Sequence, residues 1–144
     1  MSKRPAEPHR LSRVVVDAIH TEQIREHGGL PAVRDETALE SALARPRQKW
    51  HYAGEVDLAV LAASYGFGLV RNHPYCDGNK RIGFLGIVTF LGINGHDLNA
   101  TDVEVIAEML ALADGRVSEE ELAGWIRQHC GRQRKGGRLA KRSS

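Results

Sequence analysis

The 144-residue sequence predicts an all-α protein built as one domain. Three observations lead to this prediction: helix-capping side chains recur ahead of apolar segments, no convincing pair of strands is found, and one long run carries no charge. That run spans residues 82–93, and its single polar side chain is Thr89. A helix that is apolar on nearly all sides belongs in the middle of a domain. It is too short for a membrane span, which needs roughly 20 apolar residues. We therefore expect a helical bundle around this buried central helix.

Capping signals predict two helices in the first part of the chain. The first would cover residues 12–26, with a serine at its N-cap and Gly28-Gly29 as its stop. The second would cover residues 35–44 and begin at an aspartate. Pro46 should end it, because the residue before a proline is disfavoured in the helical region.

The middle of the chain predicts a short segment and then a long helix. Residues 50–52, Trp-His-Tyr, are expected to anchor a short helical or turn segment to the core. Asp57 would cap a helix that continues to Asn72, just ahead of the central helix. Both long helices are rich in small residues, and each interior Gly costs about 1 kcal/mol relative to Ala. Close approach of the two backbones would offset this cost and hold the loop between them rigidly. The small residues are Ala62, Ala63, Ser64, Gly66 and Gly68 in the first helix and Gly83, Gly86 and Gly92 in the second.

The last third of the chain contains two capping boxes, in which Ser or Thr is followed three residues later by Glu. They predict helices over residues 101–113 and 118–130, with Gly131 as the final stop. Between the central helix, which Gly95 would end, and the first of these, residues 96–100 should form a loop or a short extended piece. The domain should be almost entirely helical.

The two ends of the chain are expected to lie outside the folded domain, which we place at residues 12–131. Residues 1–11 are mostly polar, contain two prolines and lack the apolar core of a signal peptide, so we expect a disordered lead. Residues 132–144 carry six Lys or Arg and no acid, which leaves 14 basic and 18 acidic residues elsewhere. Such a basic tail is typical of a disordered end, with contact to nucleic acid or an acidic partner as the alternative. Two cysteines are too few for a disulfide framework, so a reduced, cytoplasmic setting is expected.

The densest chemistry lies in residues 71–81, Arg-Asn-His-Pro-Tyr-Cys-Asp-Gly-Asn-Lys-Arg, directly ahead of the central helix. His73 is the side chain here whose unperturbed pKa suits proton removal near pH 7. Asp77 stands next to cations and is suited to hold Mg²⁺. Gly78-Asn79 predicts a tight turn ending in an N-cap. The N–H groups of the first helical turn would then point at one spot, where a phosphate would sit well.

Lys80 would add a point charge to that spot, and Arg81 a planar fork that holds two phosphate oxygens. Base, metal ligand and phosphate cradle together indicate phosphoryl or nucleotidyl transfer to a hydroxyl. Taken alone, a His-x-x-x-Asp spacing is more often a structural hydrogen bond, and a Gly-Asn before a helix is often only a cap. His20 and Glu22 could reach the site, although a surface or satisfied structural role is expected, and Cys76 is treated as incidental. The sequence has no dinucleotide fingerprint, Walker loop, kinase-type Gly-rich loop or His-Glu-x-x-His zinc motif.

Residues 73–81 closely resemble the signature of the Fic/Doc (Fido) superfamily, His-Pro-Phe-x-Asp/Glu-Gly-Asn-Gly/Lys-Arg, with Tyr75 at the Phe position. Lys80 in place of Gly is similar to the Doc, or death-on-curing, branch. The resemblance extends over roughly residues 12–128. It also rests on four other segments: residues 27–31, Arg34-Asp35, residues 39–43 and residues 90–95.

This resemblance implies a compact helical bundle in which the active-site loop precedes the buried central helix. For the Doc branch it further implies a toxin of a type II toxin–antitoxin system. Such a toxin is a protein kinase that moves phosphate from ATP to a Ser or Thr hydroxyl of a translation factor, with elongation factor Tu as the expected target. Many Fic proteins restrain themselves with a Ser/Thr-x-x-x-Glu-Gly/Asn helix. That sequence does not occur here, so a separate antitoxin is the expected restraint.

The resemblance also implies roles for individual residues. His73 would be the general base and Asp77 the Mg²⁺ ligand. Arg71 is a weaker candidate for contact with the nucleotide or the target. The phosphates of ATP would be held by Gly78, Asn79, Lys80 and Arg81.

Two other classes of function stay open. Fic enzymes that transfer AMP from ATP usually carry Gly at the position of Lys80 and a further Arg at the position of Phe84, so both residues favour phosphoryl transfer over AMP transfer. The other class is a non-enzymatic binding module that uses the helix N-terminus and the basic tail. We expect a protein partner rather than nucleic acid, and no membrane.

Overall fold

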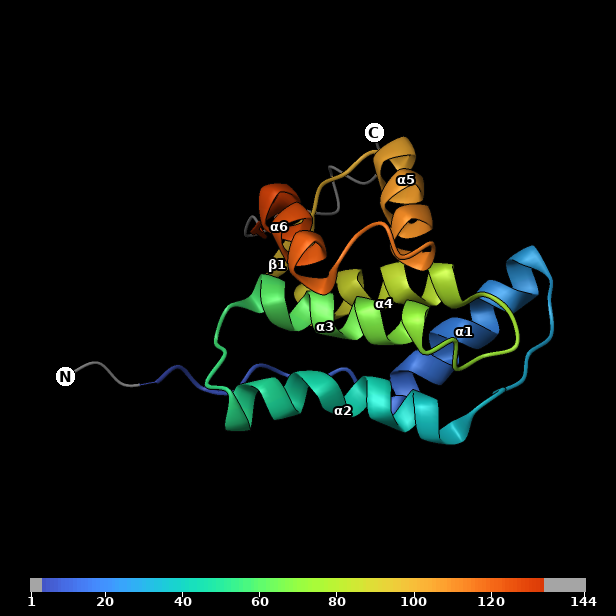
Figure 1. Cartoon of the computed structure of the whole chain (residues 1–144), viewed down its shortest axis with the longest axis horizontal. Coiled ribbons are helices and arrows are strands. Elements are labelled where there is room, and N and C mark those ends of the chain that lie inside the picture. Colours follow the sequence, from blue (N-terminus) through green and yellow to red (C-terminus); the bar gives the residue numbers. More distant parts are fainter. Residues whose placement is uncertain (1–3, 134–144) are drawn as a thin grey trace.

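The computed structural model describes residues 4–133, and within that range it contains six helices and one small sheet of two short strands (Figure 1). This architecture confirms the all-α prediction. None of the helices in the described range is long and apolar enough to cross a membrane. The elements are α1 (Arg13–His27), α2 (Glu36–Tyr52), α3 (Leu58–Arg71), α4 (Asn79–Ile93), β1 (His96–Leu98), α5 (Asp102–Ala113), α6 (Glu119–His129) and β2 (Cys130–Arg132).

Helices α3 and α4 lie side by side at the centre of the molecule, with α1 and α2 on one side and α5 and α6 on the other (Figure 1). The predicted central helix is α4, and its buried face includes Ile82, Ile87 and Leu91. Helix α3 is buried at even more of its positions than α4. The core is therefore organised around a pair of helices, and the loop of residues 72–78 connects them at one end.

Small residues let α3 and α4 come very close, as predicted. A Cβ added at Gly66 of α3 would lie 2.5 Å from Cδ1 of Ile87 in α4, and one added at Gly83 would overlap Val70. Gly68 serves a different contact, because it faces Ala42 of α2. The positions of the two helix ends that flank the 72–78 loop are therefore set by direct contact between backbones and short side chains.

Helix α2 is longer than predicted. It passes through Pro46 and ends at Tyr52, so the prediction of a stop at Pro46 and of a separate segment at 50–52 is wrong. A proline inside a helix costs about 3 kcal/mol. Here the cost is offset because Leu39, Ala42, Pro46 and Trp50 form one buried stripe at helical spacing.

Strands β1 and β2 pair antiparallel, with His96 opposite Arg132 and Leu98 opposite Cys130. The expectation that no strands would pair is therefore wrong, and α6 ends at His129 rather than at Cys130. Gly131 pairs with Asp97 instead of stopping a helix. Strands of three residues are too short to show an alternating pattern, which is why the sequence does not reveal them.

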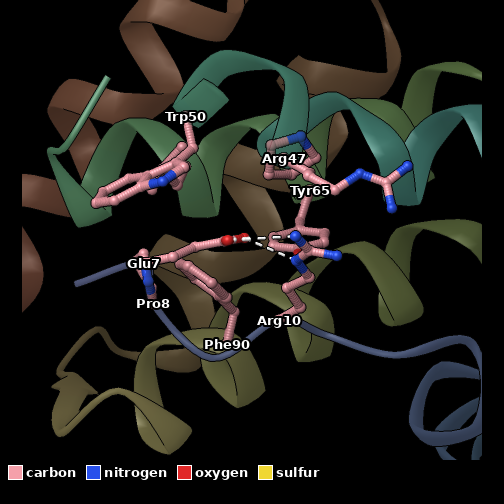
Figure 2. Close-up of a pocket in the computed structure, with 9 residues that line it drawn as sticks. Glu7, Pro8, Arg10, Arg47, Trp50, Tyr65 and Phe90 are labelled. Atoms are coloured by element: carbon pink, nitrogen blue, oxygen red, sulfur yellow. Dashed lines mark hydrogen bonds and ion pairs between the residues drawn. The ribbon is translucent and has the colours of Figure 1, made fainter. Parts of the chain in front are cut away.

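The segment before α1 contacts the helical body closely from residue 4 onward, which differs from the expected disordered lead over residues 1–11. Leu11 is buried, and its N–H donates to the Tyr65 hydroxyl at 3.1 Å. The His9 N–H donates to Oδ1 of Asn94 at 2.8 Å, and Nδ2 of Asn94 donates to the His9 carbonyl at 3.0 Å. Figure 2 shows a small pocket where this segment crosses below α2, and Glu7 and Arg10, which both line it, are paired with each other. Most of the predicted basic tail, residues 134–144, lies outside the described residues.

Candidate functional site

The loop of residues 72–78 is held by the segment that connects α1 and α2. Pro74 accepts hydrogen bonds through its carbonyl from the N–H groups of Arg34 and Asp35, at 2.7 and 3.0 Å. The Cys76 N–H donates to the carbonyl of Ala32 at 2.9 Å, and Val33 forms an isolated antiparallel bridge with Tyr75. Backbone pairing of this kind gives the loop a defined shape although it has no regular secondary structure.

Arg34 also ties the end of α3 to the loop. Its Nε donates to the carbonyl of His73 at 2.7 Å, and an Nη donates to the carbonyl of Asn72 at 3.0 Å. Carbonyls at a helix C-terminus lack partners within the helix and interact well with cations. The Arg34 guanidinium thus caps the C-terminus of α3 and fixes the backbone of His73, the candidate base.

His73 is exposed, and its backbone is in the left-handed region, with φ of 51°. Among residues 4–133 it is the only non-glycine residue with a positive φ. Such a conformation costs of order 1–3 kcal/mol and persists only where surrounding contacts enforce it. The bonds from Arg34 supply these contacts, so the imidazole is directed into solvent at the end of α3 by an enforced backbone.

Asp77 lies on the same loop with its carboxylate exposed and held by one backbone donor. Its Oδ2 accepts from the N–H of Leu30 at 2.7 Å. Gly29 comes so close that a Cβ there would be 3.0 Å from the Cβ of Asp77, and its φ of 116° also demands glycine. Within the described range, no hydrogen bond or ion pair to Oδ1 is found. This oxygen is therefore available to a ligand.

The N-terminus of α4 has no side-chain cap. Gly78 is the N-cap residue, with φ of 82°, and Asn79 is the first helical residue, so the expectation that the turn ends in a capping Asn79 is wrong. The buried Asn79 side chain turns back instead: Oδ1 accepts from the Tyr75 N–H at 3.0 Å, and Nδ2 donates to the Tyr75 carbonyl at 2.9 Å. Asn79 can therefore take part in an anion cradle only through its backbone N–H.

Lys80 and Arg81 lie exposed on the first turn of α4, and neither forms an ion pair within residues 4–133. Uncapped N–H groups, the positive end of the helix dipole and two cations make this turn suited to a polyanion. A cavity of about 200 Å³ adjoins it on the α5 side. Its lining is Lys80, Arg81, Phe84, Val105, Ile106, Met109 and Leu110.

Arg71 contacts a different part of the molecule. Its guanidinium lies over the ring of Phe67, with Cζ 5.4 Å from the ring centroid, and next to Gly115 in the turn between α5 and α6. The structure thus brings His73, Asp77 and the first turn of α4 onto one loop and helix end. It gives Arg71 contacts with Phe67 and the α5–α6 turn rather than with these residues.

The buried side of the loop rests on α1. The Tyr75 hydroxyl donates to Oδ1 of Asp17 at 2.7 Å, and the Tyr75 ring stacks on His20. Burial raises the pKa of Tyr75 above its ordinary range, and the bond to Asp17 raises it further. His20 is buried and hydrogen-bonded, which agrees with the satisfied structural role expected for it.

Sequence reasoning missed the contacts of Asp17 and Arg34 with the loop, and the structural role that it gave to Gly28-Gly29 was only that of a helix stop. The available signal was that two adjacent glycines exceed what a helix end requires. One glycine at C′ is sufficient for that purpose.

A magnesium ion bound here would have to take some of its ligands from a substrate. Among the described residues, no three His, Cys, Asp or Glu side chains gather where they could hold a metal. A single carboxylate oxygen beside a phosphate-binding turn does fit Mg²⁺, which is commonly bound by one or two carboxylates together with phosphate oxygens. Asp77 is the residue that would provide this ligand.

Fold and site together define a class: small helical domains in which a polar loop, braced from the N-terminal helices, precedes a helix with an open N-terminus. The chain belongs to the Fic/DOC family, whose model matches residues 10–91. One relative is "Protein kinase doc" of Escherichia phage P1, which is 29% identical over 112 residues, or 77% of this chain and 87% of the relative. Another is "Toxin Doc" of Mycolicibacterium smegmatis, which is 40% identical over 79 residues, or 54% of this chain and 60% of the relative. The predicted membership of the Doc branch is confirmed.

Proposed function

We propose that this protein is a Doc-type toxin that transfers the γ-phosphoryl group of ATP to a Ser or Thr hydroxyl of a translation factor, with elongation factor Tu as the expected target. The observation that supports it best is the open first turn of α4, with Lys80 and Arg81, directly after a loop that presents His73 and Asp77. The names of the two relatives, a protein kinase and a toxin, agree with this reaction and this role.

In this proposal the residues of the loop and helix divide the work. His73 accepts the proton of the target hydroxyl as its oxygen attacks the γ-phosphorus, and the bond to the bridging oxygen breaks so that ADP leaves. The N–H groups of Gly78, Asn79 and the next residues hold phosphate oxygens, together with the Lys80 and Arg81 side chains. Mg²⁺, held by Asp77 through Oδ1, would shield the charge of the phosphates.

The apolar cavity beside Lys80 and Arg81 supports a nucleotide as the phosphate donor. Its walls include Phe84 and Met109, and its volume of about 200 Å³ leaves room for part of a nucleotide. Complete pockets for drug-sized ligands measure roughly 300–1,000 Å³. We propose that this space accepts a flat aromatic group such as the base, while the phosphates stay on the first turn of α4.

The test incubates the purified protein with Mg²⁺, ATP and elongation factor Tu and measures the mass of the target. We expect a gain of one phosphate that His73→Ala slows by about two to four powers of ten. His51→Ala, which replaces an exposed histidine on α2, is the matched control and should react as the wild type does. An unchanged rate in His73→Ala would contradict the role of this residue.

The same experiment separates phosphoryl from AMP transfer. ATP labelled at the γ-phosphate should label the target, and ATP labelled at the α-phosphate should not. The reverse result would support AMP transfer, the alternative that the family scaffold keeps open. A target that gains neither label would contradict elongation factor Tu as the substrate.

We further propose that a separate antitoxin restrains the protein. Expression of the wild-type chain in a bacterial host should stop growth, and His73→Ala should not. Co-expression of the gene adjacent to this one should restore growth if it encodes the antitoxin, and the two products should then purify together. Unimpaired growth with the wild-type chain would contradict the role as a toxin.

A further inference from the structure

His20 forms a contact with the loop that its sequence position does not reveal. The side chain is only 3% exposed, and Nε2 lies 2.8 Å from the backbone carbonyl of Asp77. A carbonyl oxygen can only accept, so Nε2 carries a proton and donates it. Helix α1 thus reaches directly to the peptide that joins Asp77 to Gly78.

The His20 ring is held in this orientation by Tyr75. The two rings stack with centroids 3.7 Å apart and an angle of 12° between their planes. Tyr75 is in turn fixed at its hydroxyl by Asp17, which lies one helical turn before His20 on the same face of α1. Arg13 binds the other oxygen of Asp17 at 2.8 Å, and further Nη bonds from Arg13 connect α1 to Glu36 and Glu40 of α2.

The peptide geometry gives this hydrogen bond a consequence for the anion site. A trans peptide is planar, so its C=O and its N–H point in opposite directions. The Asp77 carbonyl is directed at His20, which belongs to α1. The N–H of Gly78 is therefore directed away from α1. Gly78 is the N-cap residue of α4 and has no side chain that could cap the helix.

We propose that His20 is a positioning residue for the phosphate-binding turn. Its hydrogen bond to Asp77 fixes the peptide that aims the Gly78 N–H at the anion, while Tyr75 and Asp17 hold the imidazole in place. His20 does not touch the anion itself. The proposal rests on the proposed function to the extent that phosphates bind at this turn, but it does not depend on which phosphate of ATP is transferred or on the target protein.

A series of variants at His20 separates the effect of its hydrogen-bond donor from the effect of its stacked ring. His20→Phe keeps a ring that can stack on Tyr75 but cannot donate, whereas His20→Gln loses the ring but places an N–H at a similar distance from the backbone. The matched control is His96→Phe, because Nδ1 of His96 also bonds a backbone carbonyl, that of Asn94, at 3.0 Å in a region remote from the loop. Thermal unfolding of each full-length variant monitors the fold.

The measurement is the dissociation constant of inorganic pyrophosphate with Mg²⁺, together with the shift of the Gly78 amide resonance on binding. His20→Phe should bind about threefold to tenfold more weakly than the wild type and lose the Gly78 shift, as removal of one hydrogen bond predicts. His20→Gln should recover most of the affinity, and His96→Phe should bind normally.

Two results would overturn the proposal: wild-type affinity in a folded His20→Phe, or absence of pyrophosphate binding by the wild type. If His20→Phe does not fold, the comparison passes to His20→Gln and His20→Ala, where tighter binding by Gln supports the proposal and equal binding overturns it. Pyrophosphate binding that depends on His20, in a protein that leaves elongation factor Tu unmodified, would support this proposal while contradicting elongation factor Tu as the target in the proposed function.

Discussion

Gly29 and Asp77 touch across the site, with only 3.0 Å between the Cβ of Asp77 and the position that a Cβ on Gly29 would occupy. The N–H of the next residue, Leu30, donates to the Asp77 carboxylate. The turn that follows α1 in sequence therefore packs directly against Asp77, the candidate metal ligand. The orientation of Asp77 depends on that turn as much as on its own loop.

Gly29→Ala should disturb both stability and the use of Mg²⁺. The new methyl group meets Asp77, and the φ of 116° costs about 1–3 kcal/mol for a residue with a Cβ. Gly28→Ala is the matched control, since its φ of 82° is also strained but no atom lies within 4 Å of the added carbon. We expect both variants to unfold at lower temperature and only Gly29→Ala to need more Mg²⁺ for half-maximal rate. The same Mg²⁺ requirement in both variants would argue against contact with Asp77 as the cause.

Arg81→Lys should weaken ATP binding although the charge is kept. A lysine lacks the planar fork that can hold two phosphate oxygens at once. We expect the KM for ATP to rise about tenfold to a hundredfold, as loss of one charge-assisted hydrogen bond predicts. Arg116→Lys changes an exposed arginine in the α5–α6 turn and should leave KM unchanged. An equal effect of both substitutions would contradict a specific contact between the Arg81 fork and the phosphates, since both substitutions keep the charge.

Gly83→Ala and Gly124→Ala should change stability in opposite directions. A Cβ at Gly83 overlaps Val70 across the α3–α4 contact, and overpacking of this kind costs about 1–3 kcal/mol. Gly124 lies within α6 with nothing within 4 Å of an added carbon, so alanine there should stabilise the protein by about 0.5–1 kcal/mol. The free energy of unfolding of both variants, measured by chemical denaturation, checks these two predictions. Stabilisation by Gly83→Ala would show that α3 and α4 can separate at little cost.

His129 should make the protein more stable in mild acid than at alkaline pH. Its hydrogen bond to the Trp125 carbonyl raises the pKa of His129 above the ordinary value of 6.5, and Glu104 adds to the effect. The folded state therefore binds the proton more tightly than the unfolded chain. The resulting stabilisation is complete below pH 6.5 and is lost as the pH rises through the raised pKa. Between pH 5.5 and 8.5, about one unit below and two above that value, the free energy of unfolding should fall less in His129→Gln than in the wild type. His27→Gln, a half-exposed position at the end of α1, is the control.

Helix starts could be predicted from the sequence because their signals are local. Ser12, Asp57, Thr101 and Ser118 all cap helices as expected, and both capping boxes are formed. The prediction failed at Pro46 because the cost of a proline inside a helix can be recognised from the local sequence. The burial that offsets this cost comes from packing of α2 against α3, which the local sequence does not show. The β1–β2 pair was not predicted for a related reason. Its two strands are three residues long and lie far apart in the chain, so their pairing depends on the position of α6.

The candidate site was predictable to the extent that it is contiguous. His73, Asp77 and the first turn of α4 lie within nine residues of sequence, and their chemistry can be recognised from residue types and spacing. The direction of each side chain could not be recognised in this way. Asn79 shows why, since the same amide that can cap a helix is here used to close the loop on Tyr75.

Apart from the local bonds between Asn79 and Tyr75, the hydrogen bonds that shape the loop reach far along the chain. Arg34 and His73 are separated by 39 positions, and His20 and Asp77 by 57. A fragment from α3 onward would contain every residue of the family signature and yet lack the donors that bend it into a site. Competence for the proposed chemistry therefore requires the N-terminal third to be packed against the loop, and an unfolded chain carries the signature in an inert form.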